Sequence, residues 1–447
     1  MTRRGREAHA GSGVGAHADA SVEAHAGSGV GAHADAGVEA HAGSGEPTGG
    51  QPEAGRLLRL APDCSPKLLE EPCLYNRATD DLYILNSEAV EFLASCANGA
   101  AAPEGAAALI DFCTEEGILE FDPAEEDILE HDQAERGRRE RRRSAPHTQS
   151  PLPSLRYLLL HITDRCNLRC RHCFIGEPGS TDLPMEKIMA AVDEFEEMQG
   201  LRLLISGGEP LLHREFWQLN GLLAGRDLRT ILLSNGTLID EQAALRLRFH
   251  EVQISLDGMR AAHDFIRGEG NFERSVAAVR RLTAAGVRVS IATMIHSRNL
   301  QDFDELAGLI EELGVREWAV DLPSVSGRLA ADSGLMVDSR MAGPLMNHSF
   351  CGAIHEPAPG YACGAHLMAV MADGGAARCG FYAGEPVGTV SEGLAACWQR
   401  VSKIPLEILD CDCELIEDCR GGCRFRAAGY NSSTGADLCQ CYRYGVL

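Results

Sequence analysis

Between residues 157 and 322, apolar runs alternate in regular order with amphipathic stretches. The apolar runs have the length and composition of buried strands, and the stretches between them have the period of helices. The pattern predicts strands at 157–162, 201–205, 230–233, 252–256, 287–293 and 318–322, and helices at 185–198, 241–249, 272–285 and 301–313. Repeated strand–helix units predict an α/β fold with a parallel sheet covered by helices and functional residues at the carboxyl ends of the strands.

A smaller unit is predicted at residues 56–121. It has strand-like runs at 56–60, 72–76 and 81–86. Two helix-like stretches follow, one at 87–93 that begins with Ser87 and one at 106–116 that ends before Gly117. Short strands followed by two helices predict a winged-helix-like α+β module. Its four cysteines are scattered along the sequence and are interpreted as packing residues: Cys64, Cys73, Cys96 and Cys113.

Two further segments lack a core-forming pattern. Residues 1–55 repeat a block of roughly sixteen residues rich in Ala, Gly, His and Ser, a composition that predicts disorder. Its regularly spaced histidines could bind metal weakly, but neutral repeat expansion is the preferred interpretation. Residues 122–153 are charged and Pro-rich, contain a basic run at 136–143, and are interpreted as a solvated linker.

Composition and charge narrow the functional class. The chain has 447 residues, 45% of them hydrophobic, which is enough for several domains. A net charge of -24 argues against general nucleic-acid binding, which needs a basic surface. The sequence shows no secretory signal and no apolar run of membrane-spanning length, so a cytoplasmic protein without membrane contact is expected. The 17 cysteines are therefore expected to bind metal rather than to form disulfides.

Three cysteines just after the first strand of the sheet give the clearest chemical signal. Cys166, Cys170 and Cys173 have the spacing CxxxCxxC, which suits three irons of a cubane and leaves the fourth iron open. A zinc knuckle is the alternative, although structural zinc favours paired CxxC units. The next strand leads into Gly-Gly-Glu-Pro at 207–210, where adjacent glycines allow close approach of a ligand and the glutamate offers a carboxylate to an amine.

With Gly-Gly-Glu-Pro after CxxxCxxC, the sequence resembles the radical S-adenosylmethionine (SAM) enzymes. The resemblance implies a partial (β/α)6 barrel, a 4Fe-4S cluster whose open iron chelates SAM, and reductive cleavage of SAM to a 5′-deoxyadenosyl radical that abstracts hydrogen. It implies that Ser255 and Asp257 contact ribose or carboxylate groups, and it identifies no catalytic residue. The full set of residues that the resemblance assigns to SAM is Gly207, Gly208, Glu209, Pro210, Ser234, Asn235, Ser255, Asp257 and Arg267. A single polar dipeptide, such as Ser234-Asn235, is more often part of a turn or a helix cap.

Ten cysteines crowd residues 351–441, far above background. Their spacings are similar to the SPASM extension of peptide-modifying radical SAM enzymes, which implies two auxiliary 4Fe-4S clusters, with zinc as the alternative. The first set is Cys363, Cys379 and Cys423, completed by Cys351 or by a substrate thiolate; the second is Cys411, Cys413, Cys419 and Cys439, with Cys439 preferred to Cys441. The pair Cys411 and Cys413 is one residue tighter than the family's CxxC. Cys397 is interpreted as a packing residue.

The segment 75–86, with 116–119, resembles the peptide-recognition element of ribosomal-peptide maturases, which is itself similar to the small chaperone of pyrroloquinoline quinone synthesis. The resemblance implies capture of a precursor's leader peptide as an added strand at an exposed edge, and an inert structural module is the alternative. The domains are accordingly expected at 1–55 (disordered repeat), 56–121 (leader recognition), 122–153 (linker), 154–325 (radical SAM core) and 326–447 (SPASM).

Together these resemblances predict a radical SAM peptide maturase that installs a crosslink, a Cys thioether or otherwise a carbon–carbon bond, in a ribosomally made precursor peptide. The implied partners are that peptide and a low-potential electron donor such as ferredoxin or flavodoxin. Two alternatives remain open. A sulfatase-maturase-like enzyme would oxidise a protein Cys or Ser and would need no leader module, whereas a noncatalytic metal-binding peptide scaffold would leave Gly-Gly-Glu-Pro unexplained.

Overall fold

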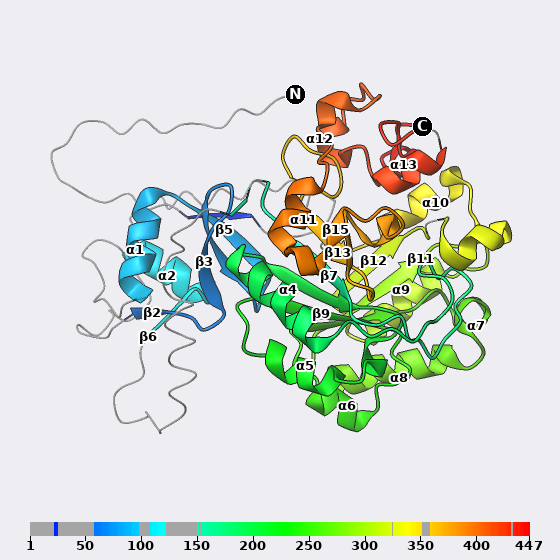
Figure 1. Cartoon of the computed structure of the whole chain (residues 1–447), viewed down its shortest axis with the longest axis horizontal. Helices are drawn as coiled ribbons and strands as arrows, with labels where there is room; N and C mark the ends of the chain where they lie inside the picture. The colour runs from blue at the N-terminus through cyan, green and yellow to red at the C-terminus, as the bar shows by residue number, and fades with distance from the viewer. Residues whose placement is uncertain are drawn as a thin grey trace.

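A nine-stranded sheet forms the centre of the computed structural model, which describes residues 22–25, 58–97, 107–121, 150–151, 153–323, 325–350, 358–430 and 432–447 (Figure 1). The sheet order is β12-β11-β10-β9-β8-β7-β13-β14-β15. The parallel strands are β7 (Tyr157–His161), β8 (Arg202–Ser206), β9 (Arg229–Ser234), β10 (Glu251–Ser255), β11 (Val289–Met294) and β12 (Glu317–Asp321). The predicted strands of the α/β fold are therefore confirmed, to within two residues at each end.

Helices cover the outer side of these strands, as predicted. They are α4 (Met185–Glu197), α5 (Phe216–Leu223), α6 (Glu241–Arg246), α7 (Arg260–Arg267), α8 (Asn271–Ala284) and α9 (Phe303–Glu312). Their apolar sides pack on alternate strand residues, such as Leu158 and Leu160 of β7, and form the main core. The sequence did not predict α5 or α7, which have only eight residues each and so carry a short periodic signal.

The opposite, inner face of the sheet carries the remaining residues of each strand. Tyr157 and Leu159 of β7 pack there with Leu204 of β8 and with Cys379 from the C-terminal region. Successive side chains of a strand point to opposite faces, so every second residue continues this inner face toward the carboxyl ends. The last inner residues of four strands are polar: His161, Ser206, Ser255 and Asp321.

The N-terminal module is an α+β unit beside the barrel. Its antiparallel strands are β3 (Cys64–Leu68), β4 (Pro72–Asn76) and β5 (Asp81–Leu85), followed by α1 (Ser87–Ala97) and α2 (Ala107–Glu115), and β2 (Leu58–Leu60) pairs with β6 (Leu119–Phe121). The sequence did not predict β3, because its Pro66 lacks a backbone donor. The proline is tolerated since β3 is an outer strand of this sheet.

One part of the N-terminal repeat departs from the expected disorder. Strand β1 (Val22–His25) pairs antiparallel with β5, with Val22 opposite Leu85 and His25 opposite Leu82. The edge of β5 presents unpaired backbone groups that an extended segment can satisfy, which explains why a sequence without a core can still form a strand here. The rest of the predicted 1–55 repeat and most of the predicted 122–153 linker lie outside the described residues.

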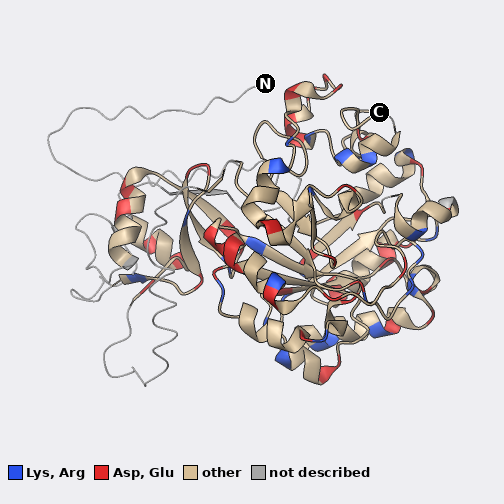
Figure 2. Cartoon of the chain, in the orientation of Figure 1, with Lys and Arg blue, Asp and Glu red and all other residues tan. Residues whose placement is uncertain are grey.

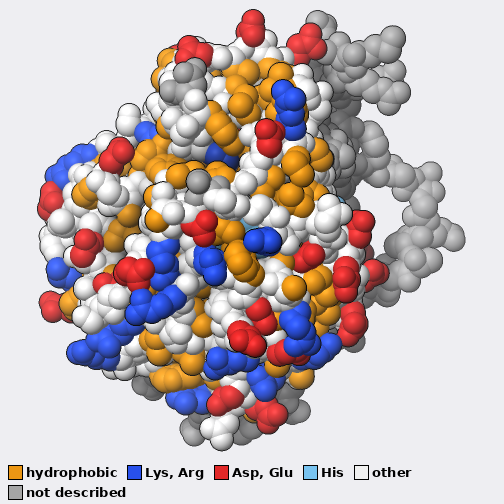
Figure 3. Space-filling model, turned by 90° about the vertical axis from the view of Figure 1, so that its right-hand side faces the viewer, with side chains coloured by type: hydrophobic (Ala, Val, Ile, Leu, Met, Phe, Trp, Pro, Cys, Tyr) orange, Lys and Arg blue, Asp and Glu red, His pale blue; other side chains and the backbone are white. Residues whose placement is uncertain are grey.

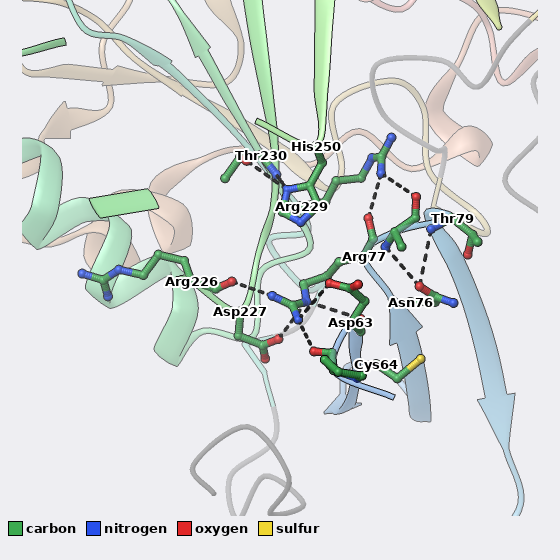
Figure 4. A network of polar contacts seen from close by, with 12 residues as sticks. Asp63, Cys64, Asn76, Arg77, Thr79, Arg226, Asp227, Arg229, Thr230 and His250 are labelled. Atoms are coloured by element: carbon green, nitrogen blue, oxygen red, sulfur yellow. Dashed lines mark hydrogen bonds and ion pairs between the residues drawn. The ribbon is translucent and has the colours of Figure 1, made fainter. Parts of the chain in front are cut away.

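Buried charges fix the module to the amino ends of β8 and β9. Asp80, in the turn between β4 and β5, pairs with Arg202 at 2.8 Å and with Arg229 at 3.2 Å. Arg229 is fully buried and donates to the Arg77 carbonyl oxygen at 2.7 Å (Figure 4). It also pairs with Glu251 of β10 at 2.8 Å. The module therefore covers the amino-terminal end of the barrel, opposite the strand ends that carry the inner polar groups.

The C-terminal region extends the barrel sheet. Strand β13 (Leu367–Val370) pairs parallel with β7, and β14 (Gly375–Ala377) and β15 (Gly388–Thr389) follow antiparallel. The helices of this region are α10 (Ser339–Leu345), α11 (Leu394–Arg400), α12 (Ile416–Cys419), α13 (Arg424–Tyr430) and α14 (Leu438–Arg443). The predicted cysteine-rich domain therefore shares one sheet with the barrel.

Asp80→Ala is expected to destabilise the protein, because it leaves Arg202 and Arg229 buried without this carboxylate. Losing one partner of a buried ion pair costs about 3–5 kcal/mol, so the thermal unfolding midpoint measured by calorimetry should fall clearly. The control is Glu312→Ala, which removes an exposed carboxylate 3.1 Å from Arg280 and should cost less than about 1 kcal/mol. Equal midpoints for the two variants would contradict a structural role for Asp80.

Candidate active site

Three cysteines follow the carboxyl end of β7 and lie close together. Both Cys170 and Cys173 are near enough to Cys166 to act on the pKa of its thiol, which burial raises to about 11. The Leu168 backbone N–H points to Cys166 Sγ at 3.4 Å, and Arg267 Nη1 lies 3.9 Å from Cys170 Sγ. Donors of this kind favour thiolate sulfur, so the donor set fits an iron–sulfur cluster.

A buried carboxylate behind this loop holds it in place. Asp257 is fully buried, and its Oδ2 accepts hydrogen bonds from His172 Nε2 at 2.8 Å and from Arg267 Nε at 2.6 Å. Burial alone would raise the pKa of Asp257, but Arg267 and His172 hold it well below its usual range. The other oxygen accepts the Met294 backbone N–H at 2.9 Å.

Asp257 thus connects three parts of the site. The sequence predicted its contact with ribose or carboxylate, and the structure shows that both carboxylate oxygens already accept hydrogen bonds from the protein. Through these bonds Asp257 positions Arg267 and the cysteine loop, since His172 stands between Cys170 and Cys173. His172 was not predicted from sequence, because a lone histidine in a cysteine motif gives no sign of which distant carboxylate it meets.

Glu209 is the fully buried carboxylate at the end of β8. It accepts hydrogen bonds from Ser234 Oγ at 3.0 Å and from the Asn235 backbone N–H at 2.9 Å, and burial raises its pKa to about 7. Asn235 Nδ2 also donates to Asn167 Oδ1, 3.0 Å away in the cysteine loop. Ser234 and Asn235 were predicted as SAM ligands, and in the structure both donate hydrogen bonds to Glu209.

The glycines before Glu209 allow two backbones to touch. A Cβ on Gly207 would lie 2.4 Å from the Thr163 carbonyl oxygen, and one on Gly208 would lie 2.3 Å from the Arg165 carbonyl oxygen. The backbone N–H groups of Gly208 and Glu209 donate to the same stretch of chain, Gly208 to Thr163 O at 2.8 Å and Glu209 to Arg165 O at 2.7 Å. The glycines thus join the end of β8 to the approach to Cys166, and Pro210 is buried behind them.

Two predicted residues keep surface for a ligand. Ser255, the last inner residue of β10, is partly exposed, and its hydroxyl makes no hydrogen bond within the described part of the chain. Arg267 binds Asp257 through Nε, which leaves Nη2 available at the same end of the barrel. These groups lie at the carboxyl ends of the strands, as predicted.

A second group of cysteines lies at the inner face of the barrel. Cys363 and Cys423 are near enough to Cys379 to act on the pKa of its thiol, which burial raises to about 12. Asp321, at the end of β12, acts in the same way on Cys363 and Cys423. The structure thus brings together the three cysteines of the first predicted auxiliary set, while Cys351 lies outside the described residues.

The third group brings Cys441 close to three cysteines of the second predicted auxiliary set. Cys411, Cys413 and Cys419 all act on the pKa of the Cys441 thiol, which burial raises. Cys439 is fully buried in the main core, with its sulfur 3.3 Å from the Tyr430 hydroxyl. Two residues apart on α14, Cys439 and Cys441 point to opposite sides of the helix. The packing of α14 therefore favours Cys441, where the sequence preferred Cys439.

Rings connect the first two cysteine groups. Phe174, next to Cys173, packs on Phe381 with ring centroids 5.5 Å apart, and Phe381 packs on Phe425 at 5.6 Å. Phe381 and Phe425 each lie two residues after a cysteine of the auxiliary set. Within the described ranges, no three His, Cys, Asp or Glu side chains converge tightly enough to hold a single metal ion. A cluster makes a different demand, because each thiolate binds its own iron.

Residues 160–310 match the Radical SAM superfamily. This part of the chain is a radical SAM domain. A radical SAM domain is catalytic, and the family implies a 4Fe-4S cluster and SAM. None of the helices in the described ranges combines the length and apolar character needed to cross a membrane.

Curated relatives match this domain. An AdoMet-dependent heme synthase of Oleidesulfovibrio alaskensis is 35% identical over 186 residues, which is 40% of this chain and 48% of that protein. The mycofactocin maturase MftC of Mycobacterium tuberculosis is 36% identical over 164 residues, 35% of this chain and 42% of that protein. The chain spans about half the length of the curated relatives that it matches.

Solved structures with the same fold cover more of the chain. Streptococcus suis SuiB bound to precursor peptide SuiA superposes with a TM-score of 0.58 at 15% identity, over 86% of this chain and 100% of that chain. The structure of anSMEcpe with bound AdoMet and Cp18Cys peptide has a TM-score of 0.53 at 20% identity, over 66% of this chain and 95% of that chain. At this identity the likeness shows the fold.

Replacing Cys439 and Cys441 of α14 by alanine, one at a time, tests which of the two is a cluster ligand. After anaerobic reconstitution, Cys441→Ala is expected to lose about four irons, the content of one cubane. Cys439→Ala should keep its iron and lose only packing, since its sulfur lies in the core. Iron counting and absorbance near 400 nm measure the difference. Loss of iron from Cys439→Ala alone would restore the assignment made from sequence.

Proposed function

We propose that this enzyme is a radical SAM peptide maturase that installs a crosslink in a ribosomally made precursor peptide, a Cys thioether or otherwise a carbon–carbon bond. Two structural features together support this proposal. The N-terminal module, which pairs β5 with β1, is fixed to the radical SAM barrel by the ion pairs of Asp80, and the cysteine-rich C-terminal region extends the barrel sheet through β13. Relatives named heme synthase and maturase both match the radical SAM domain. The substrate would therefore be determined by residues outside that domain. A sheet edge that binds a leader strand serves an enzyme that acts on a peptide.

Residues at the carboxyl ends of the strands would hold the cofactors. Cys166, Cys170 and Cys173 would bind the SAM-binding cluster, which supplies the electron for cleavage of SAM to a 5′-deoxyadenosyl radical. Glu209 would face the amine of SAM, and its buried carboxylate ionises readily once a cationic partner offsets the burial. Arg267, aimed by Asp257, would bind the carboxylate of SAM, and Ser255 would contact its ribose.

The two other cysteine groups would hold auxiliary clusters. Cys363, Cys379 and Cys423 would bind the first, completed by Cys351 or by a substrate thiolate. Cys411, Cys413, Cys419 and Cys441 would bind the second. A carbon radical left by hydrogen abstraction must lose one electron to form a closed-shell product, and an acceptor at the inner face of the barrel is within reach of a substrate held there. A low-potential donor such as ferredoxin or flavodoxin would supply the initial electron.

The edge of β5 would capture the leader. The chain's own Val22–His25 pairs there as β1, which supports the proposal that this edge accepts an extended peptide. Strand β5 starts next to Asp80, which binds the barrel, so an antiparallel guest strand runs toward the barrel. A core sequence that follows the leader would be delivered in that direction.

The module also offers a place for an apolar side chain of the guest. A cavity of about 130 Å³ opens between the sheet and α1. Its lining is largely apolar and includes Pro66, Leu68, Pro72, Leu85, Val90 and Leu93. The C-terminal region also has exposed apolar residues, among them Met341, Phe350 and Ile408. Figure 3 shows hydrophobic side chains gathered over the upper part of the molecule in that view.

The geometry sets a length for the substrate. The module lies at the amino ends of strands that have five or six residues. At roughly 3.3 Å per residue, the chemistry lies about 17–20 Å farther along the barrel. About five or more extended residues must therefore separate the bound leader from the modified residue. Residues of both charge signs are interspersed on the helices around the barrel (Figure 2), whereas an extended nucleic-acid contact needs a basic surface.

The deciding experiment is anaerobic reconstitution with iron and sulfide, followed by iron counting and a dithionite-dependent assay for 5′-deoxyadenosine. About twelve irons and turnover are expected from three cubanes. The triple variant Cys166→Ala, Cys170→Ala, Cys173→Ala should lose all SAM cleavage and about four irons. Turnover by that variant would overturn the assignment of the SAM-binding cluster, and bound zinc without turnover would overturn the proposed function as a whole.

The strand-accepting edge has its own test, with the chain's repeat as the probe. A fluorescein-labelled peptide of residues 18–29 should bind a variant that lacks residues 1–57 about tenfold more tightly than it binds the full chain, because the tethered β1 competes at high local concentration. Fluorescence anisotropy measures both affinities. The deletion should leave peptide-independent SAM cleavage unchanged, since β5 is remote from the strand ends. Equal affinities would contradict occupancy of this edge by residues 22–25.

A further inference from the structure

His161 is a buried polar side chain that the proposed cofactor contacts leave unused. It is the last residue of β7, it lies on the inner face, and it is 2% exposed. Neither of its ring nitrogens has a hydrogen-bond partner among the described residues. Leaving a buried polar group unpaired costs about 1–3 kcal/mol, so such a group in a native site calls for a functional explanation.

The imidazole lies between two of the cysteine-bearing loops. Its ring meets Phe174, the residue after Cys173, edge to face with centroids 5.7 Å apart. Its Nε2 faces Gly380, the residue after Cys379, and a Cβ placed on this glycine would lie 3.2 Å from Nε2. Glycine at 380 thus makes room for the ring, and Nε2 is aimed at the auxiliary loop.

The His161 imidazole supplies one N–H donor between the two loops. Burial lowers the pKa of His161 to about 4, so the imidazole is neutral near neutral pH and carries one N–H and one lone pair. Cys379 packs on the same inner face, against the group that contains Tyr157 and Leu159 of β7. Thiolate and sulfide sulfurs accept hydrogen bonds, and an apolar pocket strengthens such a bond.

We propose that His161 donates a hydrogen bond from Nε2 to a sulfur of the auxiliary cluster held by Cys363, Cys379 and Cys423. The inference rests on the proposed function, which places a cluster at these cysteines. A donated hydrogen bond stabilises the reduced, more negative form and so raises the reduction potential. His161 is therefore a positioning residue that makes the first auxiliary cluster a better electron acceptor.

The test is a redox titration followed by EPR, made in the triple variant of Cys166, Cys170 and Cys173 so that only auxiliary clusters contribute. Adding His161→Leu should shift one auxiliary signal to lower potential and leave the other unchanged. His161→Gln keeps an N–H donor and should restore most of the shift. An unchanged potential in His161→Leu at full iron content overturns the proposal.

A second measurement does not depend on the stability of a variant. In reduced protein with nitrogen-labelled histidine, pulsed EPR should detect a weak coupling between one histidine nitrogen and an auxiliary cluster. Absence of that coupling overturns the role of His161 while leaving the clusters in place. A chain that binds no auxiliary iron at all instead refutes the proposed function, so the two failures are distinct.

Discussion

Two buried arginines at the amino ends of β8 and β9 constrain the whole molecule. The side chains of Arg202 and Arg229 lie on the inner face, where water does not solvate their charges, so each requires a carboxylate partner. Glu251 comes from the barrel itself, but Asp80 comes from the N-terminal module. Removing the module would expose these two arginines and remove the carboxylate of Asp80. The same ion pairs hold the module, and with it the edge of β5, in a fixed place relative to the carboxyl ends of the barrel strands.

A second buried carboxylate organises that other end. Asp257 joins Arg267 to His172, and His172 belongs to the loop of Cys166, Cys170 and Cys173. Glu209 joins β8 to β9 through Ser234 and Asn235 in the same way. The strands supply a rigid frame between the two ends, and at the carboxyl ends buried polar groups hold the candidate ligand-binding residues in place.

Most of the barrel was predictable because its strands are continuous apolar runs, and the cysteine motif stands out by spacing alone. The sequence did not reveal which side of a helix faces the core or which distant residues contact each other. The choice between Cys439 and Cys441 depends on which side of α14 faces the core. The role of Asp257 depends on a histidine far away in the chain, and β1 forms only because β5 offers an edge to a segment with no core of its own.

The proline in β3 has a consequence for the module as a surface. Pro66 removes a backbone donor from the outer strand β3, while β5, from Asp81 to Leu85, contains no proline and pairs with β1. Extension of this sheet is therefore favoured on the β5 side and disfavoured on the β3 side. Pairing of two copies of the chain through β3 is hindered in the same way, which protects this edge from aggregation.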